Sequence, residues 1–214
     1  MTKIILCLSI GAGLLCSCTQ AEPRIPFGTM QALYFEGEKG PEERLSFFII
    51  AEDDDGAGNL AELYLFHDRQ ELQWLFTAEN WISVENQNRT WIGSRAIVSY
   101  NGSSLPRGQY RALLRNKSGA EVEHTFTFDA PNSPRFSFPR FTIHDEIYTI
   151  ISQYPAHYFL CYDESGNLLK TIPVEEKEGT VAGLALPSAG RTLALWAEDR
   201  DYATSALTNP QAKN

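Results

Sequence analysis

Three groups of side chains in this sequence could carry chemistry: an acidic run, four histidines and four cysteines. The acidic run is Asp53-Asp54-Asp55-Gly56-Ala57-Gly58-Asn59. Its oxygen ligands suit Ca²⁺, but an EF-hand alignment from Asp53 puts Ala57 at a ligand position and Tyr64 where a bidentate Glu is required. The flanking residues are typical of strands. We therefore expect an acidic hairpin loop and no metal site, with a looser Ca²⁺ loop as the alternative.

The histidines show no zinc pattern, because no two of them have the i, i+4 spacing of a helical metal site. They are His67, His124, His144 and His157. Alternation places His124 on the inward face of a strand, where we expect a core residue. The sequence also lacks a Gly-x-Ser-x-Gly elbow and a phosphate-binding glycine motif. We therefore expect no catalytic residue, no cofactor and no enzymatic activity. A small hydrolase whose two carboxylates meet only in space is the alternative.

The N-terminal run IILCLSIGAGLLCS (residues 4–17) contains fourteen residues without a charge and follows Lys3. A membrane-spanning helix needs about 20 apolar residues, whereas a short positive region followed by a run of this length is typical of a signal peptide. A hydrophobic first element of the folded domain is the alternative, but no polar residues give the run a second face. We expect residues 1–17 to be a signal peptide.

The end of this run is more specific, because Leu15-Cys16-Ser17-Cys18 resembles the lipobox of bacterial lipoproteins. The resemblance implies cleavage after Ser17, a diacylglyceryl thioether on Cys18 and an acyl chain such as palmitate on the new amino group. Cys16 departs from the usual pattern, and it is a poorer acceptor itself because the bulky Leu15 would precede it. Each buried CH₂ contributes about 0.8 kcal/mol, so two or three chains would anchor the protein firmly. An unlipidated, cleaved signal is the alternative.

Composition and charge limit the classes of molecule that the protein could bind. The chain has 214 residues, 43% of them hydrophobic, and carries 18 Lys and Arg against 27 Asp and Glu, a net charge of −9. Removal of Lys3 with the signal would make the charge −10. We expect no nucleic-acid partner, because binding to phosphates needs clustered cations. After lipidation of Cys18 only Cys161 would keep a thiol, so we expect no disulfide framework and a buried Cys161.

The rest of the chain predicts an all-β fold, because short apolar runs alternate with Gly, Asn, Asp, Ser and Pro clusters. The expected strands are Met30–Glu36, Leu45–Glu52, Leu60–His67, Leu72–Phe76, Thr90–Tyr100, Tyr110–Arg115 and Val122–Phe128. Seven short strands within about 100 residues indicate a β-sandwich. A helical turn within Asp68–Asn80 is the one local rival.

One hairpin can be predicted in register. A three-residue loop, Lys117-Ser118-Gly119, pairs Asn116 with Ala120. It sets Leu114 opposite Val122, Tyr110 opposite Phe126 and Arg115 opposite Glu121, so the apolar faces of both strands coincide. A two-residue loop would turn one strand over and place Arg115 opposite Val122, which disfavours it.

The segment before this hairpin, Leu105-Pro106-Arg107-Gly108-Gln109-Tyr110, resembles the corner that precedes the penultimate strand of immunoglobulin-like and fibronectin-like domains. In those domains a Tyr hydroxyl bonds back to the upstream backbone. The resemblance implies the same bond for Tyr110. No Cys…Trp…Cys pattern accompanies it, so an antibody-type domain is not implied.

The predicted organisation is a signal peptide (1–17), a lipid-anchored tether (18–26), an immunoglobulin-like β-sandwich (27–130), a smaller β domain (135–206) and a frayed tail (207–214). The strands expected in the smaller domain are Arg140–Ser152, His157–Asp163, Leu168–Val174, Val181–Leu186 and Leu193–Glu198. About 70 residues form a marginal domain without disulfides, so we expect it to pack against the first unit. A single elongated sandwich is the alternative.

Two sets of residues are candidates for binding. Trp81 lies in a polar stretch and could stack on a sugar or anchor a protein, although a core position is the simpler interpretation. Arg111, Arg115 and Lys117 form a basic row that could dock an anionic partner. The alternative for this row is cross-strand pairing with Glu121 and Glu123.

Taken as a whole, the sequence resembles the uncharacterised lipoproteins of spirochaetes, especially treponemes, through its lipobox and its sandwich pattern. The resemblance implies a lipid-anchored cell-envelope protein, held on a membrane or at the cell surface, with a binding or structural role toward a protein or glycan in the envelope. The alternatives are a dedicated glycan-binding module that uses Trp81 and, third, a small envelope hydrolase.

Overall fold

The computed structural model describes residues 21–38, 40–100 and 102–212. The predicted signal peptide and Cys18 lie outside the described residues. The described part is built from β-strands and three short 3₁₀ helices, Ala57–Asn59, Asp68–Gln70 and Ala182–Leu184. The all-β prediction is confirmed.

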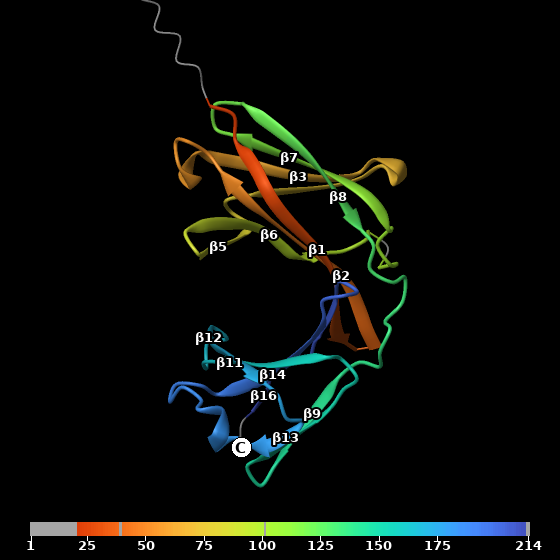
Figure 1. The fold of residues 1–214 in the computed structure, drawn as a ribbon, viewed down its shortest axis with the longest axis vertical. Coiled ribbons are helices and arrows are strands. Elements are labelled where there is room, and N and C mark those ends of the chain that lie inside the picture. The colour runs from red at the N-terminus through yellow and green to blue at the C-terminus, as the bar shows by residue number, and fades with distance from the viewer. Residues whose placement is uncertain (1–20, 39, 101, 213–214) are drawn as a thin grey trace, which may run out of the picture.

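The first unit is a sandwich of two four-stranded layers (Figure 1). One layer has the order β1-β2-β6-β5, comprising β1 (Arg24–Gly37), β2 (Gly40–Glu52), β6 (Arg89–Ile97) and β5 (Ile82–Asn86). The other has the order β4-β3-β7-β8, comprising β4 (Leu72–Thr77), β3 (Leu60–His67), β7 (Gly108–Asn116) and β8 (Glu121–Phe128). In immunoglobulin strand letters these orders read A-B-E-D and C′-C-F-G, so the topology is immunoglobulin-like.

Alternate residues of the two layers fill the core between them, as expected for strands buried on one face. Phe47 and Ile49 from β2 meet Leu63, Leu65 and Tyr110 from the opposite layer, and all five side chains are fully buried. Strand β5 was not predicted, because its sequence Ile82-Ser83-Val84-Glu85-Asn86 is short and polar. In the segment where a helical turn was the alternative, the structure has the 3₁₀ helix Asp68–Gln70, and β4 follows it.

The hairpin of β7 and β8 has the predicted register. Asn116 N–H donates to the carbonyl of Ala120 over 3.0 Å, and Arg115 lies opposite Glu121. The prediction that His124 is a core residue is wrong, because its side chain is exposed. Strand β8 is the edge of its layer, and the His124 ring packs beside Phe126.

The second unit also has two layers. A three-stranded sheet of order β13-β10-β9 contains β9 (Arg140–His144), β10 (Ile147–Ile151) and β13 (Glu178–Thr180). It covers a core against β11 (Ala156–Tyr162), β12 (Leu168–Val174) and β14 (Thr192–Asp199). Cys161 is buried in this core, as predicted. The predicted strand Val181–Leu186 is wrong: Val181 has helical backbone angles and the 3₁₀ helix Ala182–Leu184 follows.

The two units share one sheet. The second half of β1 pairs in parallel with β15 (Thr204–Leu207), from Ala32 opposite Thr204 to Phe35 opposite Leu207. The joined sheet runs β12-β11-β14-β15-β1-β2-β6-β5. Residues 129–139 form a linker without strands, close to the predicted boundary, yet hydrogen bonds along β1 join the predicted domains 27–130 and 135–206. The molecule is C-shaped, closed along β1 and β2 and open on the other side (Figure 1).

The ends of the described chain are more ordered than the sequence indicates. Strand β1 starts at Arg24, within the segment predicted as a tether (18–26), and Arg24 lies opposite Glu52 of β2. In the predicted frayed tail (207–214), Asn209 N–H donates to Glu36 Oε2 over 3.0 Å and β16 (Gln211–Ala212) pairs with β14. Backbone hydrogen bonds, which composition does not reveal, account for both differences.

Candidate functional site

The acidic loop before β3 uses its first carboxylate internally. Asp53 Oδ1 accepts hydrogen bonds from Asp55 N–H (2.9 Å) and Asn59 Nδ2 (3.0 Å), and its Oδ2 accepts one from Asn116 Nδ2 (3.0 Å). Burial alone would raise the pKa of Asp53, but these hydrogen bonds and the charge of Arg24 lower it overall. Among the described residues, no group of three or more His, Cys, Asp or Glu side chains is placed to hold a metal ion.

The predicted basic row lies on the outer face of β3 and β7, where carboxylates flank both arginines. Arg111 donates to Asp68 over 2.9 and 3.1 Å and to Glu123 over 2.8 Å. Arg115 donates to Glu62 over 2.7 Å and to Glu121 over 2.6 Å. The cross-strand pairing with Glu121 and Glu123 is therefore present, and β3 and its following turn add two further acids.

Aromatic rings hold the same guanidinium groups in place. Arg111 lies 4.3 Å from the centre of the Phe66 ring and Arg115 lies 5.5 Å from that of Tyr64. Lys117 is exposed in the hairpin turn, and its backbone N–H donates to the carbonyl of Asn59. Four carboxylates around two arginines make this face acidic rather than basic, so the row does not present a surface for anions.

Trp81 does not lie at the surface position considered for it. The side chain is half-buried and packs against the core of the first unit. Its backbone N–H donates to the carbonyl of Thr77 over 2.8 Å in the turn before β5. The alternative of a core position describes Trp81 better.

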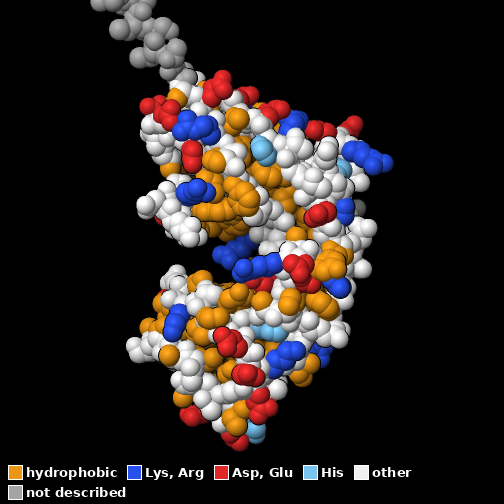
Figure 2. Space-filling view, viewed as in Figure 1, with side chains coloured by type: hydrophobic (Ala, Val, Ile, Leu, Met, Phe, Trp, Pro, Cys, Tyr) orange, Lys and Arg blue, Asp and Glu red, His pale blue; other side chains and the backbone are white. Residues whose placement is uncertain are grey.

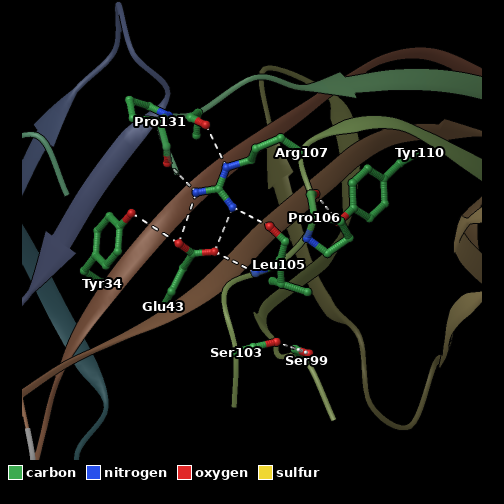
Figure 3. Close-up of polar contacts among 10 residues, drawn as sticks. Tyr34, Glu43, Ser99, Ser103, Leu105, Pro106, Arg107, Tyr110 and Pro131 are labelled. Atoms are coloured by element: carbon green, nitrogen blue, oxygen red, sulfur yellow. Dashed lines mark hydrogen bonds and ion pairs between the residues drawn. The ribbon is translucent and has the colours of Figure 1, made fainter. Parts of the chain in front are cut away.

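A buried ion pair between Glu43 and Arg107 joins the corner segment to β2 and to the linker (Figure 3). Arg107 Nη1 and Nη2 donate to the two carboxylate oxygens of Glu43 over 2.8 and 3.1 Å. Arg107 Nε donates to the carbonyl of Ala130 (2.7 Å), Nη1 to that of Leu105 (2.6 Å) and Nη2 to that of Pro131. All five N–H donors of the guanidinium thus have an acceptor.

Further hydrogen bonds surround the Glu43–Arg107 pair. Glu43 also accepts hydrogen bonds from Leu105 N–H (3.0 Å) and from the hydroxyl of Tyr34 (3.3 Å). On β7, three residues after Arg107, the Tyr110 hydroxyl donates to the carbonyl of Pro106 over 2.8 Å, and the tyrosine is fully buried (Figure 3). This is the bond expected for a tyrosine corner. The pair therefore fixes the place where the first unit ends and the linker begins.

A groove lies on the open side of the molecule, between the two units. It has a volume of about 420 Å³ and is lined by side chains of β1, β2, β5 and β6 from the first unit and by Trp196 of β14 from the second. Figure 2 shows the hollow, with hydrophobic side chains on both walls and Lys or Arg side chains at its inner end. We call this feature the inter-unit groove.

The inter-unit groove combines aromatic rings with neutral polar groups. Phe48, Trp91 and Trp196 line it, and all three are half-buried. Phe27 packs edge-on against Trp91, with ring centres 5.9 Å apart. Trp196 Nε1 donates to Glu198 Oε2 over 3.3 Å, which fixes the indole in position. The groove walls are therefore set by packing and hydrogen bonds before any ligand arrives.

Arg95 is the charged residue of the groove lining. Among the described residues its guanidinium has no ion-pair partner, unlike those of Arg111 and Arg115. Burial raises the pKa of Tyr162 on β11, and the charge of Arg95 opposes that rise. The charge of Arg95 on the first unit therefore acts on a residue of the second unit.

Sequence reasoning missed this groove because Trp91 and Trp196 stand in apolar runs that suggest a core. A usable signal was present in β6, where Trp91 and Arg95 are four residues apart and therefore share a face of the strand, on either side of the buried Ile92-Gly93-Ser94. An arginine on the same face as a tryptophan indicates that this face meets solvent.

Fold and topology place the chain in the class of immunoglobulin-like β-sandwich proteins. No family model matches the sequence, and no curated protein matches it. Among solved structures, "Tp47, the 47-Kilodalton Lipoprotein of Treponema pallidum" aligns with a TM-score of 0.33 and 9% identity over 87% of this chain and 51% of that one. The chain thus spans about half the length of Tp47.

Two immunoglobulin-domain structures also align over 88% of the chain. Murine CEACAM1b gives a TM-score of 0.26 and 11% identity over 99% of its own chain. A chain of the complex of Dpr11 IG1 with DIP-gamma IG+IG2 gives 0.28 and 8% identity over its whole length. At such scores the immunoglobulin-like assignment depends on the strand order of this protein itself.

Proposed function

We propose that the protein is a lipid-anchored component of a bacterial cell envelope with a binding or structural role. The observation that carries the proposal is Leu15-Cys16-Ser17-Cys18 at the end of an uncharged run of fourteen residues. Cleavage after Ser17 and acylation of Cys18 would place two or three acyl chains at the new N-terminus. Among the described residues, no helix is long and apolar enough to cross a membrane.

The N-terminal end of the described chain indicates which end of the molecule would lie next to the membrane. The carbonyl of Ala21 accepts a hydrogen bond from Asn116 Nδ2 over 3.1 Å, and Pro23 is buried. Three residues span at most about 10 Å, so an acylated Cys18 would hold the β7–β8 turn close to the membrane surface. The second unit lies at the opposite end of the molecule (Figure 1) and would point away from the membrane.

We also propose that the protein binds rather than catalyses. Three buried acids of the described part have cationic neighbours. Glu43 pairs with Arg107, Glu198 with Arg200 over 2.7 Å, and Asp199 lies 3.8 Å from Arg135. Such pairing is typical of carboxylates with a structural role.

The anchor is tested by expressing the full-length chain in a bacterium and separating it with Triton X-114. We expect the protein to enter the detergent phase despite its charge, and its intact mass to begin at Cys18 with added acyl mass. Cys18→Ala should leave a precursor 17 residues longer in place of the mature chain. Cys16→Ala is the matched control and should be processed and lipidated normally.

Two results would contradict the anchor. One is a mature chain that begins at residue 19 or later without acyl mass. The other is normal processing of the Cys18→Ala variant. Either result would leave an exported protein whose β-sandwich is not tied to a membrane.

A further inference from the structure

The inter-unit groove has the dimensions of a site for a small ligand rather than of a protein interface. Its volume of about 420 Å³ falls within the range of ligand pockets. A stable protein interface buries about 800 Å² on each partner, which is more than the ten side chains lining this open groove provide. The walls come from two units that share a hydrogen-bonded sheet, so the groove is held open in the absence of a ligand.

The side chains of the groove suit a sugar. Phe48, Trp91 and Trp196 contribute aromatic surface, and aromatic rings can stack on the apolar C–H surfaces of pyranose rings. Neutral polar side chains stand beside them and can exchange hydrogen bonds with hydroxyl or amide groups of a ligand. They are Thr29, Gln31, Ser46 and Asn86. A purely hydrophobic ligand would leave these polar groups unpaired, which costs free energy.

The charge of the groove limits which sugars could bind there. As far as the described residues go, the lining contains the cation Arg95 and no Asp or Glu. A cationic ligand would find no counter-ion there, whereas a carboxylate-bearing sugar could form a charge-assisted hydrogen bond with the unpaired guanidinium. The groove therefore favours neutral and acidic sugars over basic ones.

We propose that the inter-unit groove binds an oligosaccharide, with Trp91 and Trp196 stacking on sugar rings from the two units and Arg95 binding an acidic substituent. The proposal gives a ligand to the binding role proposed above and rests on that role, but not on the lipid anchor. An extended peptide added to the edge strand β5 is the competing occupant, and it is an outcome of the test.

The test uses the full-length chain in a detergent without a sugar headgroup. The probes are chitotetraose, cellotetraose and tetragalacturonate, and the readouts are tryptophan fluorescence and calorimetric titration. We expect saturable binding of at least one probe and tighter binding of the acidic one. Trp196→Ala should weaken binding about tenfold or more, as expected for an aromatic anchor. Arg95→Gln should remove the preference for tetragalacturonate without weakening the neutral sugars.

Two further variants guard against loss of folding. Ser46→Trp places a ring inside the groove and should block binding while the thermal melt stays close to that of the wild type. Trp74→Phe is the control, because Trp74 lies on β4 and donates to the carbonyl of Val98, away from the groove. It should bind sugars like the wild type.

Three results would overturn the proposal. The first is no saturable binding of any probe up to about 10 mM by folded protein, a limit weaker than ordinary ligand affinity. The second is sugar binding that survives both Trp196→Ala and Ser46→Trp. The third is that an extended peptide, but none of the sugars, protects the groove tryptophans from quenching by iodide. The Cys18→Ala variant should keep sugar binding, so failure of the anchor and failure of the groove can be distinguished.

Discussion

Arginine–carboxylate pairs occur in two regions of the molecule, and their surroundings differ. In the Glu43–Arg107 pair the two side chains are 7% and 13% exposed. On the outer face of β3 and β7, the side chains around Arg111 and Arg115 are between 30% and 64% exposed. The distances are similar, at 2.8 Å for Arg107 and 2.7 to 2.9 Å for three of the outer contacts. Geometry alone would rank the two regions as equal.

Burial separates their roles. Water and salt screen the outer pairs, so each contributes a fraction of a kcal/mol and mainly sets the charge of the face. Inside the protein, removal of one partner leaves the other charge without compensation. The Glu43–Arg107 pair also joins β2, the corner and the linker through backbone carbonyls. The Glu43–Arg107 pair therefore determines how the first unit connects to the linker, whereas the outer pairs mainly determine the surface charge of β3 and β7.

The largest effect is expected for Arg107→Met. It leaves the Glu43 carboxylate buried and removes donors from three carbonyls, so the free energy of unfolding should fall by about 3–5 kcal/mol. Urea denaturation measures it. Arg69→Met, at an exposed arginine of the 3₁₀ helix Asp68–Gln70, is the control and should change little. A loss below about 1 kcal/mol for Arg107→Met would make the buried pair equivalent to the outer ones.

The next effect concerns alkaline pH at the same buried site. Burial, and then the charge of Glu43, raise the pKa of Tyr34 from 10.0 to about 12. The folded state therefore holds this proton more tightly than the unfolded chain, and the stabilisation is complete below pH 10 and lost between pH 10 and about 12. Tyr34→Phe should flatten the fall in melting temperature over that range. An unchanged slope would contradict the burial of the hydroxyl.

A smaller effect is expected at the corner. Tyr110→Phe keeps the ring but deletes the hydrogen bond to Pro106, so the free energy of unfolding should fall by about 1–2 kcal/mol. Tyr64→Phe is matched to it, because its hydroxyl donates to Glu62 on the outer face. That variant should cost less than about 0.5 kcal/mol. Equal losses for the two tyrosines would argue against a structural role of the corner bond.

The smallest effect is expected for the outer pairs. Arg111→Gln and Arg115→Gln should each cost less than about 1 kcal/mol at low salt, and the cost should vanish in about 1 M NaCl because the charges are screened. Denaturant melts at both salt concentrations measure this. A cost that persists at high salt would mean that stacking on Phe66 and Tyr64, rather than charge, holds the arginines.

Local features could be predicted from the sequence, and features that join distant segments could not. The register of the β7–β8 hairpin and the Tyr110 bond follow from turn length and side-chain alternation within about 25 residues. Arg111 and Arg115 pair with acids of β3 and its following turn, and Arg107 with Glu43, Ala130 and Pro131. These partners lie 23 to 64 residues away, beyond any local pattern. The position of His124 and the exposure of Trp91 depend on which strand faces are covered, which one sequence does not reveal.

The parallel pairing of β1 with β15 has a consequence for the order in which the protein is made. The ribosome makes Ala32 early, and its partner Thr204 follows only after the whole of the chain between them. Until then the second half of β1 presents an unpaired sheet edge, which is prone to wrong pairing. Closure must wait for a contact of very high sequence separation, which slows folding. We expect the chain to depend on a holding chaperone until its synthesis is complete, and truncation before residue 204 to leave the edge of β1 open to aggregation.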